Sequence, residues 1–224
     1  MRTASMYWAV KRFLLLCLIA AATRSANAQV LFDQSINSSY VNGGMFSTLG
    51  GQQFADDFLP ATSGKVDGVT WWGSFYQMRD RFNTGDFWGF HARIFDNAAG
   101  LPGSMLMDAT VSALITETAY DNTFGDRIYR FDASVSGPAL AAGTEYHFSA
   151  VDSNTGGPFV NRFITQPVAY GTGSIRSGDS DPSWSSHTSS RGEMAYVIHG
   201  MVPEPGTLGV LGLGAAALLR RRRR

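Results

Sequence analysis

The sequence predicts an all-β fold, an antiparallel β-sandwich of the jelly-roll type, over residues 29–201. Short segments of alternating apolar and polar residues recur there, and Gly, Pro, Asn, Asp and Ser separate them at roughly ten-residue spacing. Helical periodicity is nearly absent, and an apolar fraction of 44% is enough to build a core. We find no internal repeat, which argues against a solenoid or a propeller.

Two strands are predicted in the first half of this region. In residues 66–76, the alternation places Val69, Trp71 and Phe75 on one face. In residues 87–95, one face is markedly more apolar and is the predicted core face. Its members are Trp88, Phe90, Ala92 and Ile94.

The second half supplies three further strands and one helical turn. Residues 127–133 alternate, and so do residues 145–151, where Tyr146, Phe148 and Ala150 share a face. Residues 195–199 form the predicted last strand. Residues 112–118 are the only segment that favours a helical turn, and the long loops carry the Gly and Pro residues.

The N-terminus, residues 1–28, has the three parts of a secretory signal peptide. Lys11 and Arg12 supply positive charge, residues 13–22 are apolar, and Ala26 and Ala28 form a small-x-small cleavage site. Ten apolar residues are too few to span a bilayer, which needs about 20. We expect cleavage after Ala28, with the export translocon and signal peptidase as the first partners.

The C-terminus combines a short motif, an apolar run and a basic end. The motif is Val202, Pro203, Glu204 and Pro205, the apolar run is residues 206–219, and the basic end is Arg220, Arg221, Arg222, Arg223 and Arg224. The prolines interrupt helix continuity, and the arginines stay cytoplasmic and stop transfer. As a helix the run measures about 21 Å, shorter than a hydrocarbon core of about 30 Å. A short anchor of this kind suits a transient membrane intermediate.

These residues resemble the PEP-CTERM sorting signal of bacterial exported proteins. The resemblance covers residues 202–224. It implies that an exosortase, a membrane protease-transpeptidase, recognises Pro203, Glu204 and Pro205 and removes the tail. The protein would then pass from the membrane to the cell surface or the medium. The family tends to occur in bacteria that make exopolysaccharide. The tail is also named the ice-binding protein C-terminal domain, after ice-binding proteins that carry it. The tail itself indicates sorting and not ice binding.

The region between the two ends is acidic, although the formal net charge of the chain is zero. Nine of the 18 basic residues lie in residues 1–28 or in the terminal arginine run, whereas all 18 acidic residues lie between them. Residues 29–219 therefore carry about nine net negative charges. Phosphate backbones repel such a surface, so nucleic acid is not an expected partner.

Residues 29–201 also resemble a loosely defined group of β-sandwich domains that often precede this tail. Short segments carry the resemblance, namely residues 54–58, 71–75, 93–96, 100–103 and 140–144. They are mostly structural, and the group implies no catalytic residues. The single cysteine, Cys17, lies in the leader, so the exported region can form no disulfide.

Acidic residues and histidines are the candidates for chemistry. Glycosidases need two facing carboxyl groups, and Asp56, Asp57, Glu117 and Glu145 are candidates that the sequence cannot pair. The four histidines show no metal-site spacing, and His147 and His199 are predicted to face outward. We expect no catalytic residue. Calcium is the only candidate cofactor, and its candidate ligands are Asp179 and Asp181, because hard cations prefer oxygen ligands.

Tryptophans supply the remaining functional hypothesis. Exposed Trp side chains can stack on sugar rings, and Trp72 and Trp184 are the candidate carbohydrate contacts. Trp71 and Trp72 are adjacent on a strand and must point to opposite faces. The favoured function is a structural or adhesive role with exopolysaccharide. The alternatives are a glycosidase-like enzyme and an ice-binding surface protein, although no ladder of regularly spaced Thr occurs.

Overall fold

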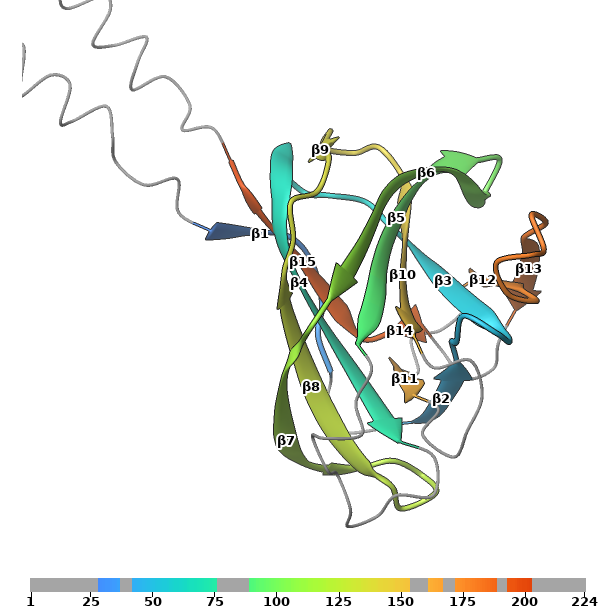
Figure 1. Ribbon diagram of the computed structural model, residues 1–224. Helices are drawn as coiled ribbons and strands as arrows, with labels where there is room; N and C mark the ends of the chain where they lie inside the picture. Colours follow the sequence, from blue (N-terminus) through green and yellow to red (C-terminus); the bar gives the residue numbers. More distant parts are fainter. Residues whose placement is uncertain are drawn as a thin grey trace, which may run out of the picture. The chain divides into compact units, whose positions relative to one another are not determined.

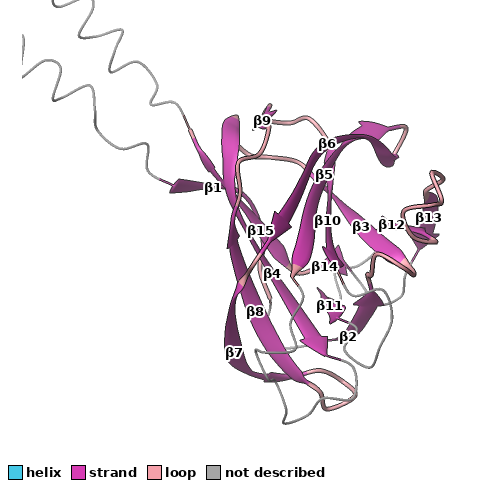
Figure 2. Ribbon diagram, viewed as in Figure 1, coloured by secondary structure: helices cyan, strands magenta, loops and turns pink. Residues whose placement is uncertain are grey.

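A computed structural model describes residues 28–36, 42–75, 89–153, 161–166, 172–188 and 193–202. Within these ranges every regular element is a β-strand (Figures 1 and 2). The strands form two antiparallel sheets in a sandwich-like arrangement, which confirms the predicted all-β class. Leader residues 1–27 and the predicted tail helix, residues 206–219, lie outside the described residues.

The larger sheet has nine strands. They are β1 (Ala28–Gln34), β2 (Asn42–Phe46), β4 (Gly64–Phe75), β7 (Leu114–Asp121), β8 (Arg127–Ser134), β9 (Ala139–Leu140), β11 (Asn161–Gln166), β14 (Glu193–Met194) and β15 (Tyr196–Met201). The main path runs β1-β15-β4-β11-β14, with β8 beside β4 and β7 beside β8. Strand β4 is therefore the centre of this sheet.

The smaller sheet has six strands in the order β13-β12-β3-β10-β5-β6. Their bounds are β3 (Gln53–Phe58), β5 (Phe90–Ala98), β6 (Leu101–Val111), β10 (Tyr146–Asp152), β12 (Thr172–Arg176) and β13 (Ser185–Thr188). Strand β10 lies between β3 and β5, and all seven of its residues are buried.

Aromatic rings fill the space between the sheets. Trp71 of β4 stacks on Phe131 of β8 with centroids 5.3 Å apart, and Phe90 of β5 meets both rings edge-on. Phe148 of β10 stacks on Tyr196 of β15 at 5.1 Å. The inward faces follow the two-residue period of a strand, so the predicted core faces of β4, β5 and β10 are confirmed over the described residues.

The predicted helical turn at residues 112–118 is wrong. Strand β7 begins at Leu114 and pairs with β8, with Leu114 opposite Asp132 and Glu117 opposite Tyr129. Among the described strands β7 pairs with β8 alone, and most of its residues are at least partly exposed. Because an edge strand gains its backbone bonds from one neighbour and buries little, its sequence need not show the alternation of a half-buried strand.

The first and last strands pair with each other. Ala28 lies opposite Met201, and Gln34 lies opposite Tyr196. The Tyr196 hydroxyl also donates a hydrogen bond of 3.0 Å to the backbone carbonyl of Asp57 in the smaller sheet. The 15 strands of the described residues fall within residues 28–201, which form one compact unit. Every strand pairing that the structure describes therefore lies in this stretch.

Replacement of Trp71 by Ala should remove one aromatic contact between the sheets, the edge-on packing of Trp71 against Phe90. Trp71 is 0% exposed, and loss of a buried Trp leaves a cavity that costs about 3–5 kcal/mol of unfolding free energy. Urea unfolding of residues 29–201 measures the change. Leu114→Ala is the control, because Leu114 is 69% exposed and its loss should cost less than about 0.5 kcal/mol. Equal losses for the two variants would contradict the assigned core.

Candidate functional site

A buried arginine lies on the outer face of the smaller sheet. Arg93 follows the core-facing Ala92 on β5 and is opposite Ser149 of β10, so it points away from the core. It is nevertheless only 2% exposed. A buried charge is costly unless it is paired and hydrogen-bonded, so the surroundings of Arg93 must supply anions and acceptors.

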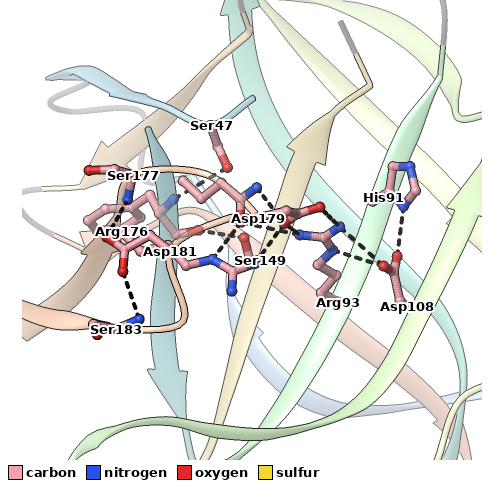
Figure 3. Close-up of polar contacts among 12 residues, drawn as sticks. Ser47, His91, Arg93, Asp108, Ser149, Arg176, Ser177, Asp179, Asp181 and Ser183 are labelled. Carbon is pink, nitrogen blue, oxygen red and sulfur yellow. Dashed lines mark hydrogen bonds and ion pairs between the residues drawn. The ribbon is translucent and has the colours of Figure 1, made fainter. Parts of the chain in front are cut away.

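Two carboxylates and one amide surround the Arg93 guanidinium (Figure 3). The Asp179 carboxylate accepts two hydrogen bonds from Arg93 in a bidentate pair, from Nη1 to Oδ1 at 2.6 Å and from Nη2 to Oδ2 at 2.9 Å. Asp108 Oδ2 accepts from Nε at 3.2 Å, and Gln53 Oε1 accepts from Nη1 at 3.2 Å. The contacts join β3, β5 and β6 to the loop that follows β12. We use the name arginine clamp for the five residues Gln53, Arg93, Asp108, Arg176 and Asp179.

Arg176, the last residue of β12, completes this cluster. Its Nε donates to Gln53 Oε1 at 2.8 Å, and its Nη2 donates to Asp179 Oδ1 at 2.8 Å. The guanidinium lies 4.7 Å from the centroid of the Trp184 ring, in cation-π geometry. Trp184 in turn meets Phe95 edge-on at 5.5 Å. The predicted sugar-stacking residue Trp184 is therefore half-buried and braces Arg176.

The electrostatics of the clamp follow from this geometry. Hydrogen bonds from Arg93, with further contributions from Gln53 and Arg176, hold the pKa of Asp179 at about 2, although partial burial opposes the shift. Burial lowers the pKa of Arg93, but Asp179 and Asp108 outweigh it and the net shift is upward. Burial lowers the pKa of Arg176. Asp179 is thus ionised at neutral pH and serves as a counter-ion.

The environment of Asp179 is unfavourable for the predicted calcium site. Both of its carboxylate oxygens accept hydrogen bonds from guanidinium groups, which would repel a divalent cation. Asp181 instead caps its own loop, accepting from the backbone N–H of Ser183 at 2.9 Å and of Ser177 at 3.4 Å. Among the described residues, no three His, Cys, Asp or Glu side chains are grouped as metal ligands.

The expected exposure of Trp72 is wrong. Trp72 points away from the core, as its position next to Trp71 requires, but it is only 8% exposed. Ile128, Ala195 and Val197 form a second apolar cluster with it on the outer side of the larger sheet. Trp72 lies on the larger sheet, whereas Trp184 lies in the loop before β13 and packs on Phe95 of the smaller sheet, so they do not form one binding face.

His147 faces outward, as predicted, but other residues cover it. His147 lies opposite Asp57 and Phe95 on the outer face of the smaller sheet, yet it is 1% exposed. Burial lowers the pKa of His147, against the opposing charges of Asp57 and Asp96, so the ring is neutral at pH 7. His199 is partly exposed, and its Nε2 lies 2.9 Å from Thr70 Oγ1.

The four candidate catalytic carboxyl groups lie in three places, with Asp57 and Glu145 both beside His147. Asp56 is buried and accepts hydrogen bonds from Gln34 Nε2 and the Met194 N–H, whereas its neighbour Asp57 points to the opposite face of β3. Glu117 on the edge strand β7 forms an ion pair with Arg127. Glu145 lies beside His147, with Oε1 3.9 Å from Nε2.

An open polar cavity adjoins the clamp and was not predicted from the sequence. It has a volume of about 350 Å³, and its walls include Gly50, Gly51, Arg176, Asp181 and Ser183. Residues more than 120 positions apart in the chain form it, because the turn before β3 meets the loop after β12. No local pattern could have placed those two segments together.

Removal of Asp179 should destabilise the domain. In Asp179→Ala the buried Arg93 loses its bidentate partner, which should lower the unfolding free energy by about 1–3 kcal/mol. The pKa of Asp179 in the folded protein is below its ordinary value. Its contribution to the unfolding free energy is therefore present above about pH 4 and is lost as the pH falls toward 2. Urea unfolding of residues 29–201 at several pH values should show this pH-dependent loss of stability in the wild type.

The matched control for this test is Asp121→Ala, which removes an exposed carboxylate 3.3 Å from Arg127. Its effect should be below about 1 kcal/mol. If the wild type and Asp179→Ala lose stability in parallel below pH 4, the assigned role of Asp179 is refuted.

The tail begins directly after the folded domain. Val202 follows Met201, the last residue of β15, and residues 203–224 lie outside the described residues. The part of the chain that the structure describes contains no helix long and apolar enough to cross a membrane. Residues 202–224 match the family model of the PEP-CTERM protein-sorting motif, which confirms the predicted resemblance. No curated protein matches the chain. The chain is therefore an exported protein with a C-terminal PEP-CTERM signal, and this signal directs it to exosortase sorting.

Proposed function

We propose that this protein is a structural or adhesive component of the cell surface that associates with exopolysaccharide. The observation that carries the proposal is the direct attachment of the sorting signal at residues 202–224 to one compact β-domain. The signal delivers the domain to the outside of the cell. A domain at that location is in contact with the extracellular polysaccharide and can bind it.

The contacts of the acidic residues support a binding role over a catalytic one. Asp179 and Asp108 neutralise Arg93, Asp56 joins strands across the core, and Glu117 pairs with Arg127. Each of these four carboxylates makes a structural contact within the domain. A pair of acids that performs glycoside hydrolysis must instead face a substrate from two sides.

The sorting steps follow from the order of the segments. Signal peptidase cuts after Ala28, and the apolar run 206–219 then holds the chain in the membrane while the terminal arginines stop transfer. Exosortase processes the tail at Pro203–Pro205. Gln29, the first residue after removal of the leader, pairs with Gly200 at the end of the β1–β15 ladder, so the two processed ends of the mature domain are neighbours.

Substitution of the motif should block tail removal. In the full chain with Pro203→Ala and Pro205→Ala, the recognised motif is lost, and we expect the protein to accumulate in the membrane fraction at its unprocessed size. Immunoblotting of cell fractions from the producing organism measures this. Pro182→Ala is the control, because Pro182 is exposed in a domain loop outside the motif. Normal processing of the double variant would contradict the assignment of Pro203 and Pro205.

Residues 29–201 should bind the exopolysaccharide of the producing organism. We expect saturable binding that is unchanged when calcium is removed with a chelator, because guanidinium groups already occupy Asp179. Co-sedimentation with the purified polysaccharide measures it. Absence of binding both with and without calcium would refute the polysaccharide role.

A further inference from the structure

We propose that the cavity between the turn before β3 and the loop after β12 binds a single neutral sugar unit. This inference rests on the proposed function and assigns it a site. The cavity opens to solvent and has a volume of about 350 Å³, which is at the small end of the range of about 300–1,000 Å³ for ligand sites. That size favours one ring of a polysaccharide over a long segment.

The walls of the cavity are built and held in place. Gly178 has a φ of +86°, which L side chains rarely adopt. A Cβ at this position would lie 3.2 Å from the carbonyl oxygen of Gly51 and 3.3 Å from that of Leu49. Glycine therefore lets the loop after β12 lie against the turn before β3. The arginine clamp then fastens this loop through Asp179, the residue next to Gly178.

The groups that line the cavity suit hydroxyl ligands. The Asp181 carboxylate is an acceptor, the Arg176 guanidinium is a donor, and the Ser177 and Ser183 hydroxyls are both (Figure 3). A sugar presents hydroxyl groups that donate and accept, so it can satisfy all of them. Ile175 supplies an apolar wall for the C–H face of the ring.

The charges around the cavity favour a neutral ligand. Arg176 is its cation, but Asp179 already binds the Arg176 guanidinium at 2.8 Å. Asp181 adds a negative charge to the wall, and the domain as a whole is acidic. An anionic sugar would meet net repulsion, whereas a neutral sugar would gain charge-assisted hydrogen bonds to Asp181.

Titration of residues 29–201 with methyl glycosides of glucose, galactose and mannose, and with glucuronate as the anionic comparison, tests the proposal. Calorimetry and saturation-transfer NMR report binding. We expect at least one neutral probe to bind and glucuronate to bind at least about tenfold more weakly. Binding by no neutral probe, or preference for glucuronate, would overturn the proposal.

Two substitutions locate the site. Ser183→Trp places a large ring at an exposed wall residue and should abolish binding of the neutral probe. Ser136→Trp is the matched control, because Ser136 is an exposed loop residue between β8 and β9, and it should leave binding unchanged. Asp181→Asn keeps an acceptor for the Ser183 N–H but loses the charge, so affinity should fall about tenfold. Equal binding by Ser183→Trp and the wild type would overturn the assigned cavity.

The same variants separate this inference from the proposed function. If Ser183→Trp loses the sugar probe and also the exopolysaccharide, the cavity is the matrix-binding site. If it keeps full exopolysaccharide binding, the cavity is refuted as that site while the matrix role remains. If the wild type does not bind the exopolysaccharide but binds the probe at this cavity, the cavity is upheld and the matrix role fails.

Discussion

The packing of Tyr196 between the two sheets is the contact on which the domain depends. Its ring stacks on Phe148 of the smaller sheet and lies 5.2 Å from Phe32 of β1, and its hydroxyl donates to the backbone of Asp57. Tyr196 begins β15, the last strand, which lies between β1 and β4. The fold therefore closes only when its final residues are available, and formation of the first strand's ladder must wait for them.

The last strand lies directly before the sorting signal in the sequence. The PEP-CTERM signal starts at residue 202, one position after the last strand ends at Met201. The folded domain and its sorting signal thus meet with no spacer in the sequence. Since β15 ends at Met201 and pairs with β1 and β4, removal of the tail beyond Val202 leaves the described strand pairings intact.

The arginine clamp gives a loop of small polar residues a defined shape. Residues 177–183 contain Gly, Ser, Asp and Pro and bury little apolar surface, so the hydrophobic effect alone would not hold them. The bidentate contact from Arg93 to Asp179 and the Arg176–Trp184 stack replace that missing apolar contact. Because Arg93 is buried, its desolvation offsets much of its attraction to the more exposed Asp179, so this pair adds more to geometric definition than to net stability.

By itself, the sequence determined the all-β class, the inward faces of β4, β5 and β10, and the sorting tail. Each of these is a local property, because alternation acts over adjacent residues and the tail is a continuous motif. The tertiary structure alone decided the burial of Trp72 and His147, the strand at Leu114, and the cavity beside the arginine clamp. These depend on which strands become neighbours. Trp72 is buried in a second apolar cluster, and residues from Leu114 onward form a strand because they pair with β8. Arg93 binds Asp179, which is 86 residues away in the chain. Period-two alternation states which side a residue faces, but only the assembled sheets determine what covers that side.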